Sequence, residues 1–162
     1  MTEETWKTAI TQPLVRGHYF EEFTVGQKVT SPARTITEAD VVNFAALTGD
    51  WNQIHTDAEF ARTTVFGQRI AHGLLILSIA SGLVARLGLI EGTVEAFREL
   101  RWKFRAPVFI GDTIHLKATV TETRPLPRLG NGLVILEISV LNQRAEVVQK
   151  GTWEALVRSR PV

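Results

Sequence analysis

The sequence contains no cysteine, which excludes disulfide bonds, zinc–thiolate sites and cysteine nucleophiles. It also lacks a clear excess of positive or negative charge, with 18 Lys and Arg side chains against 17 Asp and Glu side chains. Nucleic acids and membrane surfaces are held poorly without a concentrated basic field, so we expect neither as a partner and expect a small molecule instead. The most apolar segment, 73–89, is interrupted by Arg86 and is shorter than the ~20 residues that span a bilayer.

The N-terminus has no basic segment followed by an apolar one, so we find no secretory signal and expect a cytoplasmic protein. A length of 162 residues suits one domain, because a chain of this size buries roughly two-thirds of its unfolded surface. Residues 1–19 show little periodicity and are expected to form an N-terminal arm. The domain is then predicted to cover residues 20–162.

The first half of the chain predicts one strand and two or three helices. Residues 25–36 resemble a strand with an irregularity at Pro32, and Thr37 is expected to cap a helix that Gly49 ends. An irregular polar loop and a short helix over 57–62 follow. Residues 70–88 are predicted to form a second long helix that is apolar on nearly all sides, so other structure must wrap it.

The second half alternates apolar and polar residues, which is typical of half-buried strands. The alternation covers 100–105, 114–121, 134–140 and 149–157, with turns at 111–112, 130–132 and 142–145. Antiparallel strands after an apolar helix favour an α+β domain in which a curved antiparallel sheet wraps around a long central helix.

The loop between the first helices concentrates the polar chemistry. Asp50, Asn52, His55 and Asp57 lie within eight positions. Because irregular backbone has no fixed periodicity, an acid and a histidine five residues apart can converge on one point, and partial burial would suit the pair to proton transfer on a water molecule. Asp57 is also a natural helix cap, and a histidine such as His72 is often purely structural. No recognised metal-ligand spacing is present, so we expect no metal.

The segment Phe44–Leu83, "FAALTGDWNQIHTDAEFARTTVFGQRIAHGLLILSIASGL", resembles the hydratase motif of MaoC-like proteins, the (R)-specific enoyl-CoA hydratases and dehydratases of the hotdog fold. The stretches "FEEFTVGQKV" and "FRAPVFIGDTI" resemble two further parts of that family. One departure is Gln53, which stands where the family usually has proline.

The resemblance implies a role for particular residues. Asp50 and His55 match the catalytic pair, Asn52 the polar residue that supports it, and Gly73 the backbone donor that binds the thioester oxygen. Ser81 matches a helix serine that lines the site, and His72 is grouped with the substrate-binding residues. The implied reaction is the reversible addition of water to a trans-2-enoyl-CoA, giving an (R)-3-hydroxyacyl-CoA. No cofactor is expected, because the thioester itself acidifies C2.

Other functions remain open at this stage. The chain could be the active subunit of a 3-hydroxyacyl-acyl-carrier-protein dehydratase, a hotdog thioesterase or a non-catalytic acyl-binding protein. We expect a homodimer or higher homo-oligomer, because an uncovered sheet edge favours pairing. Coenzyme A carries phosphates, so cations should lie near its binding site. The candidates are Arg69 and the strand residues Arg101, Lys103 and Arg105, although such a row of cations is more often simply solvated. Trp51 is a candidate for shaping the acyl pocket.

Overall fold

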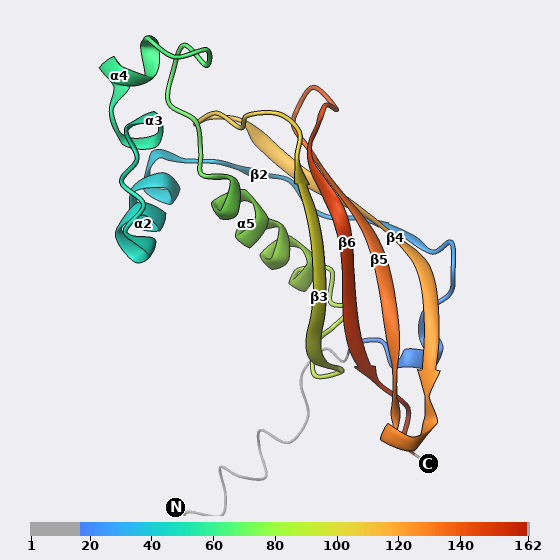
Figure 1. Ribbon diagram of the computed structural model, residues 1–162. Coiled ribbons are helices and arrows are strands. Elements are labelled where there is room, and N and C mark those ends of the chain that lie inside the picture. The colour runs from blue at the N-terminus through green and yellow to red at the C-terminus, as the bar shows by residue number, and fades with distance from the viewer. Residues whose placement is uncertain (1–16, 162) are drawn as a thin grey trace, which may run out of the picture.

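The computed structural model describes residues 17–161, which form one antiparallel sheet and one long helix packed against it (Figure 1). The sheet order is β1-β4-β5-β6-β3, and the short β2 also pairs with β4. The strands are β1 (Lys28–Thr30), β2 (Arg34–Thr35), β3 (Val94–Phe104), β4 (Thr113–Leu126), β5 (Asn131–Leu141) and β6 (Val147–Arg158). All pairs are antiparallel, as the alternation of apolar and polar residues predicts.

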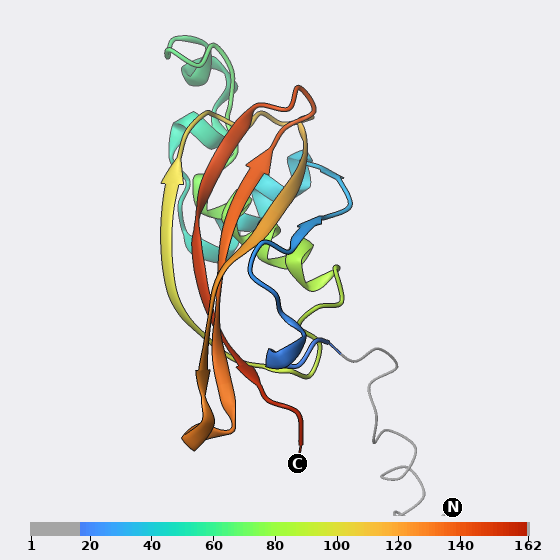
Figure 2. The same cartoon turned by 90° about the vertical axis from the view of Figure 1, so that its right-hand side faces the viewer.

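The helix α5 (Gly73–Ala85) lies along the concave face of this curved sheet (Figures 1 and 2). Its buried side chains pack against inward-facing residues of β4, β5 and β6 in the main hydrophobic core. Fully buried members of that core include Ile76, Leu83, Leu116, Ile138 and Val148. The predicted α+β architecture, with a sheet around an apolar helix, is therefore confirmed.

One face of α5 is not wrapped. The side chains of Leu74, Ser78, Ser81 and Ala85 recur at intervals of three or four residues, and all of them are exposed. Residues with this spacing share one side of a helix. The expectation of a helix covered on every side is therefore too strong for the chain on its own, and the stripe is built mainly from small residues.

The helices before α5 begin and end where local chemistry dictates. The Thr37 hydroxyl accepts from the Asp40 N–H at the start of α2 (Glu38–Thr48), and Gly49 ends this helix with φ of 76°, which favours glycine. The Asp57 side chain accepts from the Phe60 N–H and caps α4 (Ala58–Arg62). These predicted caps are confirmed.

The structure also departs from the prediction elsewhere. The helix predicted over 70–88 covers only Gly73–Ala85, and the strand predicted from residue 100 begins at Val94. The first predicted strand is split into β1 and β2, because the chain breaks pairing around Pro32, which has no N–H to donate. The loop predicted over 50–57 contains a single helical turn, α3 (Gln53–Thr56), which the sequence analysis missed. The remaining helical turns are the short η1 (Phe20–Glu22) and η2 (Pro127–Leu129).

The predicted arm falls largely outside the described residues. Its last residues are tied to the domain, because the Gly17 N–H donates to the Glu91 carbonyl at 2.8 Å and the His18 N–H donates to the Leu89 carbonyl at 2.9 Å. Within residues 17–161, none of the helices is long and apolar enough to cross a membrane.

Gly151 allows β3 and β6 to lie close together, and this predicts a stability effect. A Cβ at this position would overlap the carbonyl oxygen of Arg101 and crowd the Trp102 ring. Gly151→Ala should therefore lower the free energy of unfolding by about 1–3 kcal/mol, as overpacking typically does. Thr152→Ala, on the other face of β6, is the control and should shift it by less than about 0.5 kcal/mol. Urea unfolding measures both variants, and equal stabilities would contradict the prediction.

Candidate active site

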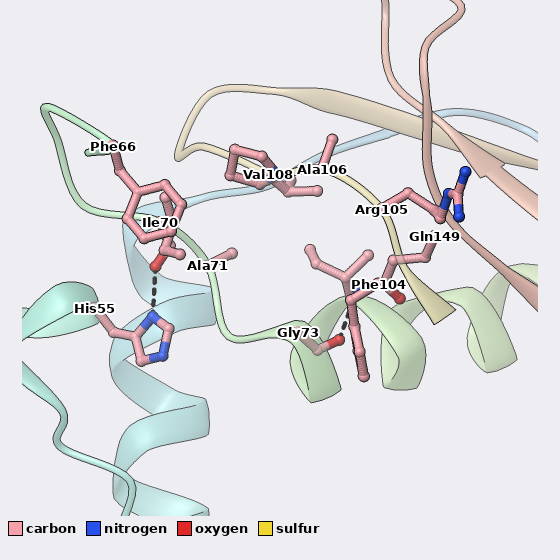
Figure 3. Close-up of a pocket in the computed structure, with 12 residues that line it drawn as sticks. His55, Phe66, Ile70, Ala71, Gly73, Phe104, Arg105, Ala106, Val108 and Gln149 are labelled. Carbon is pink, nitrogen blue, oxygen red and sulfur yellow. Dashed lines mark hydrogen bonds between the residues drawn. The ribbon is translucent and has the colours of Figure 1, made fainter. Parts of the chain in front are cut away.

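The single turn α3 places the imidazole of His55 at a pocket wall. The Asn52 side chain accepts from the Ile54 N–H at 3.2 Å and so begins this turn. His55 is buried, and its Nδ1 lies 2.8 Å from the carbonyl oxygen of Ile70 (Figure 3). A carbonyl oxygen only accepts, so Nδ1 carries the proton of the neutral ring and Nε2 keeps its lone pair. His55 is thereby held in the form of a base.

The carbonyl that orients His55 belongs to backbone that is itself held on both sides. The Ile70 N–H donates back to the Ile54 carbonyl at 3.2 Å, and the next N–H, of Ala71, donates to the Val108 carbonyl at 2.8 Å. Ile70 also forms an isolated antiparallel bridge with Phe109. The segment between α4 and α5 therefore links α3 to the loop that follows β3.

Asp50 lies beside His55, as the five-residue spacing predicts. A carboxylate oxygen of Asp50 and one ring nitrogen each of His55 and His72 lie within 4.8 Å of one another. The Asn52 N–H donates to the Asp50 carboxylate at 3.3 Å, which helps to orient it. Burial applies to His55 but not to Asp50, whose side chain is exposed in the isolated chain.

His72 contacts both Asp50 and His55. Its Nε2 lies 2.9 Å from the backbone carbonyl of Asp50, to which it donates, and its ring is stacked on His55 with centroids 3.8 Å apart. It is buried, and the Phe44 ring lies on it with centroids 5.1 Å apart. These contacts give His72 a structural role in fixing the Asp50 loop.

Burial lowers the pKa of His55 from its usual value of 6.5. The neighbouring His72 acts in the same direction, while the hydrogen bond to Ile70 and the charge of Asp50 oppose the shift. The imidazole therefore stays neutral to lower pH than a free histidine, which suits a proton acceptor.

Gly73 is the first residue of α5, and its N–H lies at the end of the helix where such groups have no intrahelical partner. A Cβ on Gly73 would come within 2.8 Å of the Phe104 ring, so a larger residue would push that ring away. The helix dipole also concentrates positive potential at this end. The arrangement provides a donor for a developing negative charge on oxygen.

A pocket of about 400 Å³ separates His55 from the start of α5 (Figure 3). Its walls come from α3, the segment before α5, the end of β3 with its following loop, and β6. They include His55, Ile70, Gly73, Phe104, Arg105 and Gln149. The volume and mainly apolar lining suit a small substrate with a few polar groups.

Asp50 and the predicted binding residues other than Gly73 are not among the residues that line this pocket. Asn52 caps α3, and the His72 ring is stacked on the His55 ring. Ser81 is on the exposed face of α5, where its hydroxyl donates to the Ser78 carbonyl at 2.7 Å. A substrate-binding role for these three residues stays a prediction.

The structure separates the cation candidates. Arg105 lines the pocket and has no ion pair to another residue of the 17–161 region. Arg101 instead pairs with Glu99 at 2.6 Å, and Arg69 pairs with Glu38 at 2.6 Å. Trp51, the candidate for the acyl pocket, is exposed and not among the lining residues.

Sequence analysis missed Gln149, which lines the pocket although it is only 2% exposed. The sequence signal that could have found it is the alternation of inward-facing residues along β6. Gln149 has the same inward parity on β6 as Trp153, Ala155 and Val157, all of which are buried. A polar residue at an inward strand position must find hydrogen bonds inside the fold.

Asp50, His55 and His72 are the group of described residues whose donor atoms lie close enough to suggest a metal site. The imidazole rings, however, are stacked 3.8 Å apart with planes tilted by 31°. Imidazole lone pairs lie in the ring plane, so stacked rings direct them side by side and not toward one ion. The geometry therefore favours acid–base chemistry over metal binding.

Comparison with known proteins places the chain in a family. Residues 21–139 match the MaoC like domain. The (R)-specific enoyl-CoA hydratase of Rhodospirillum rubrum is 42% identical over 108 residues, which cover 67% of this chain and 73% of that protein. Protein MaoC of Klebsiella aerogenes is 40% identical over 101 residues, 62% of this chain but only 30% of that longer protein.

Solved structures agree. The MaoC-like dehydratase from Rhodospirillum rubrum superposes with a TM-score of 0.81 at 30% identity, covering 90% of this chain and 100% of that chain. A Mycobacterium tuberculosis protein with a double hotdog fold superposes with a TM-score of 0.80 at 22% identity, covering 90% of this chain and 45% of that chain, and supports the fold alone. The resemblance seen in the segment Phe44–Leu83 is thus confirmed over most of the domain. The chain belongs to the MaoC-like domain family and has its hotdog fold.

Proposed function

We propose that this protein is an (R)-specific enoyl-CoA hydratase that adds water reversibly to trans-2-enoyl-CoA. The observation that carries the proposal is a pocket that both His55 and Gly73 line, together with an Asp50 carboxylate oxygen within 4.8 Å of a ring nitrogen of His55. The names of the relatives support the substrate class, since the Rhodospirillum rubrum protein is called an (R)-specific enoyl-CoA hydratase. We place the reaction in the cytoplasm.

The proposed reaction begins with a water molecule held between Asp50 and the free Nε2 of His55. The neutral imidazole accepts a proton from this water while its oxygen bonds to C3 of the enoyl thioester. The electrons of the C2–C3 double bond move toward the carbonyl, which becomes an enolate oxygen bound by the Gly73 N–H. C2 then takes a proton from the Asp50–His55 pair, which regenerates the starting state and completes the addition of water.

No cofactor enters this scheme. The thioester polarises the double bond and acidifies C2, so a positioned acid and base together with an oxyanion donor suffice. Each of these devices contributes on the order of 10²- to 10³-fold in rate. Arg105, at the pocket, is the cation best placed to meet the phosphates of coenzyme A.

We also propose that two copies of this chain associate through β3. This strand is an outer edge of the sheet, and apolar side chains on it are exposed: 53% for Phe97, 40% for Leu100 and 56% for Phe104. The exposed face of α5, which carries Leu74 and Ser81, supplies a second uncovered surface. An exposed apolar edge is a template for pairing, and a second copy would cover it.

Asp50→Asn and His55→Gln should each reduce the hydration of crotonyl-CoA by at least about a hundredfold, because each removes half of the acid–base pair. The loss of enoyl absorbance measures the rate, and chiral analysis should identify the (R) product. Asp57→Asn is the matched control in the same segment, because Asp57 only caps α4, and it should retain activity. Parental rates in both site variants would refute the assignment, and release of free thiol would indicate a thioesterase.

The pH profile of kcat/KM should reflect the lowered pKa of His55. The acidic limb of the profile should have unit slope and be centred below pH 6.5, because protonation of His55 removes the base. The folding stability should decrease as the pH falls below 6.5, because the unfolded chain takes up this proton first, and the decrease should end once the folded His55 is also protonated. His115→Gln, on β4 outside the pocket, should leave the profile unchanged. An acidic limb centred above pH 6.5 would contradict the lowered pKa of His55.

Sedimentation should give twice the 18.0 kDa chain mass for the native protein. Leu100→Glu should produce a monomer. Dimerisation would bury its carboxylate on the apolar edge without a cation or hydrogen-bond donor to pair with it, which is costly. Val65→Glu, at a residue that is 96% exposed on the loop after α4, should leave the dimer intact. A monomeric native protein would rule out the proposed pairing.

A further inference from the structure

Gln149 connects the sheet to the first residue of α5. Its Oε1 lies 2.8 Å from Trp102 Nε1, and its Nε2 lies 2.9 Å from the carbonyl oxygen of Gly73. The side chain is almost completely buried and lines the pocket, and Figure 3 shows its bond to Gly73. Three elements, β3, β6 and α5, therefore meet at one amide.

The two partners determine which way the amide points. The indole N–H of Trp102 can only donate, and the carbonyl of Gly73 can only accept. The oxygen of Gln149 must therefore face Trp102, and its NH₂ group must face Gly73. The reverse orientation would bring two donors together at one end and two acceptors at the other, and the buried site has little water to relieve that conflict.

The bond controls the position of the helix start. Gln149 is paired in register with Phe104, whose ring packs where a Cβ of Gly73 would lie. The first turn of α5 is thus hydrogen-bonded from β6 and contacted by a ring from the end of β3. Without the bond, the turn could shift within the pocket wall, and a displacement of 1 Å can cost about a hundredfold in rate.

We propose that Gln149, oriented by Trp102, is a positioning residue that keeps the Gly73 N–H directed at the thioester oxygen. The inference rests on the proposed function, because it assigns a purpose to the oxyanion donor of that reaction. A positioning role affects the rate of the chemical step more than binding, since the charge on the thioester oxygen is largest after the water has attacked.

The test replaces Gln149 with methionine, which has a similar length and volume but makes neither hydrogen bond. For the hydration of crotonyl-CoA, Gln149→Met should lower kcat by about tenfold or more and leave KM within about twofold. Trp102→Phe should also lower kcat. Because Trp102 acts through Gln149, the double variant should be no slower than Gln149→Met by more than about twofold.

Asn131→Leu is the matched control. It removes another buried amide, whose Nδ2 lies 3.1 Å from Glu95 Oε2 at the opposite end of β5. This variant should lower Tm but leave kcat unchanged. If Gln149→Met also lowered only Tm, Gln149 would be merely structural and the proposal would be wrong. A rise in KM at constant kcat would make Gln149 a substrate contact and would also overturn it.

A second measurement does not require activity. The amide resonance of Gly73 in ¹H–¹⁵N spectra should move in Gln149→Met, while the resonance of Gly130, in the turn before β5, should stay in place. An unmoved Gly73 resonance would overturn the positioning role, whatever the kinetics. A shifted resonance in a protein whose native form hydrates no enoyl-CoA would support the link between Gln149 and Gly73 and would refute the proposed function alone.

Discussion

The hydrogen bond from His55 to the carbonyl of Ile70 is the interaction on which the chemistry of this site depends. It assigns the proton of the neutral ring to Nδ1 and leaves the lone pair of Nε2 free for the base that the proposed mechanism requires. The acceptor is held in place because the Ile70 N–H donates to a carbonyl of α3, and the N–H of the next residue donates to a carbonyl in the loop after β3. The tautomer of one side chain is therefore decided by backbone contacts between segments far apart in sequence.

In the proposed mechanism, the groups that take part in the reaction differ from the residues that hold them in place. His72 contacts both members of the proposed acid–base pair, through a hydrogen bond to the Asp50 carbonyl and a stacked ring on His55, yet it does not line the pocket. Gln149 does the corresponding work on the far wall for Gly73. Each side of the proposed site is thus hydrogen-bonded by a buried polar side chain.

Several parts of the structure stay exposed in the chain on its own. Asp50 is exposed, the adjacent face of α5 carries small residues, and the edge strand β3 presents aromatic and aliphatic side chains. The apolar strand edge and the open face of α5 are unfavourable for a chain alone in water, because they expose apolar side chains and unpaired backbone groups. A second copy against β3 would cover them, which gives one physical reason for both the apolar edge and the open face of the helix.

Much of this protein follows from local sequence. Thr37, Gly49 and Asp57 mark helix ends through their own caps, the period-two segments produce the antiparallel strands, and the short spacing of Asp50 and His55 brings them together. Local rules reach no further than neighbouring residues in the chain. The burial of His55 beside an exposed Asp50, the open face of α5 and the contact between Gln149 and Gly73 were decided by tertiary structure, because each depends on segments that only folding brings into contact.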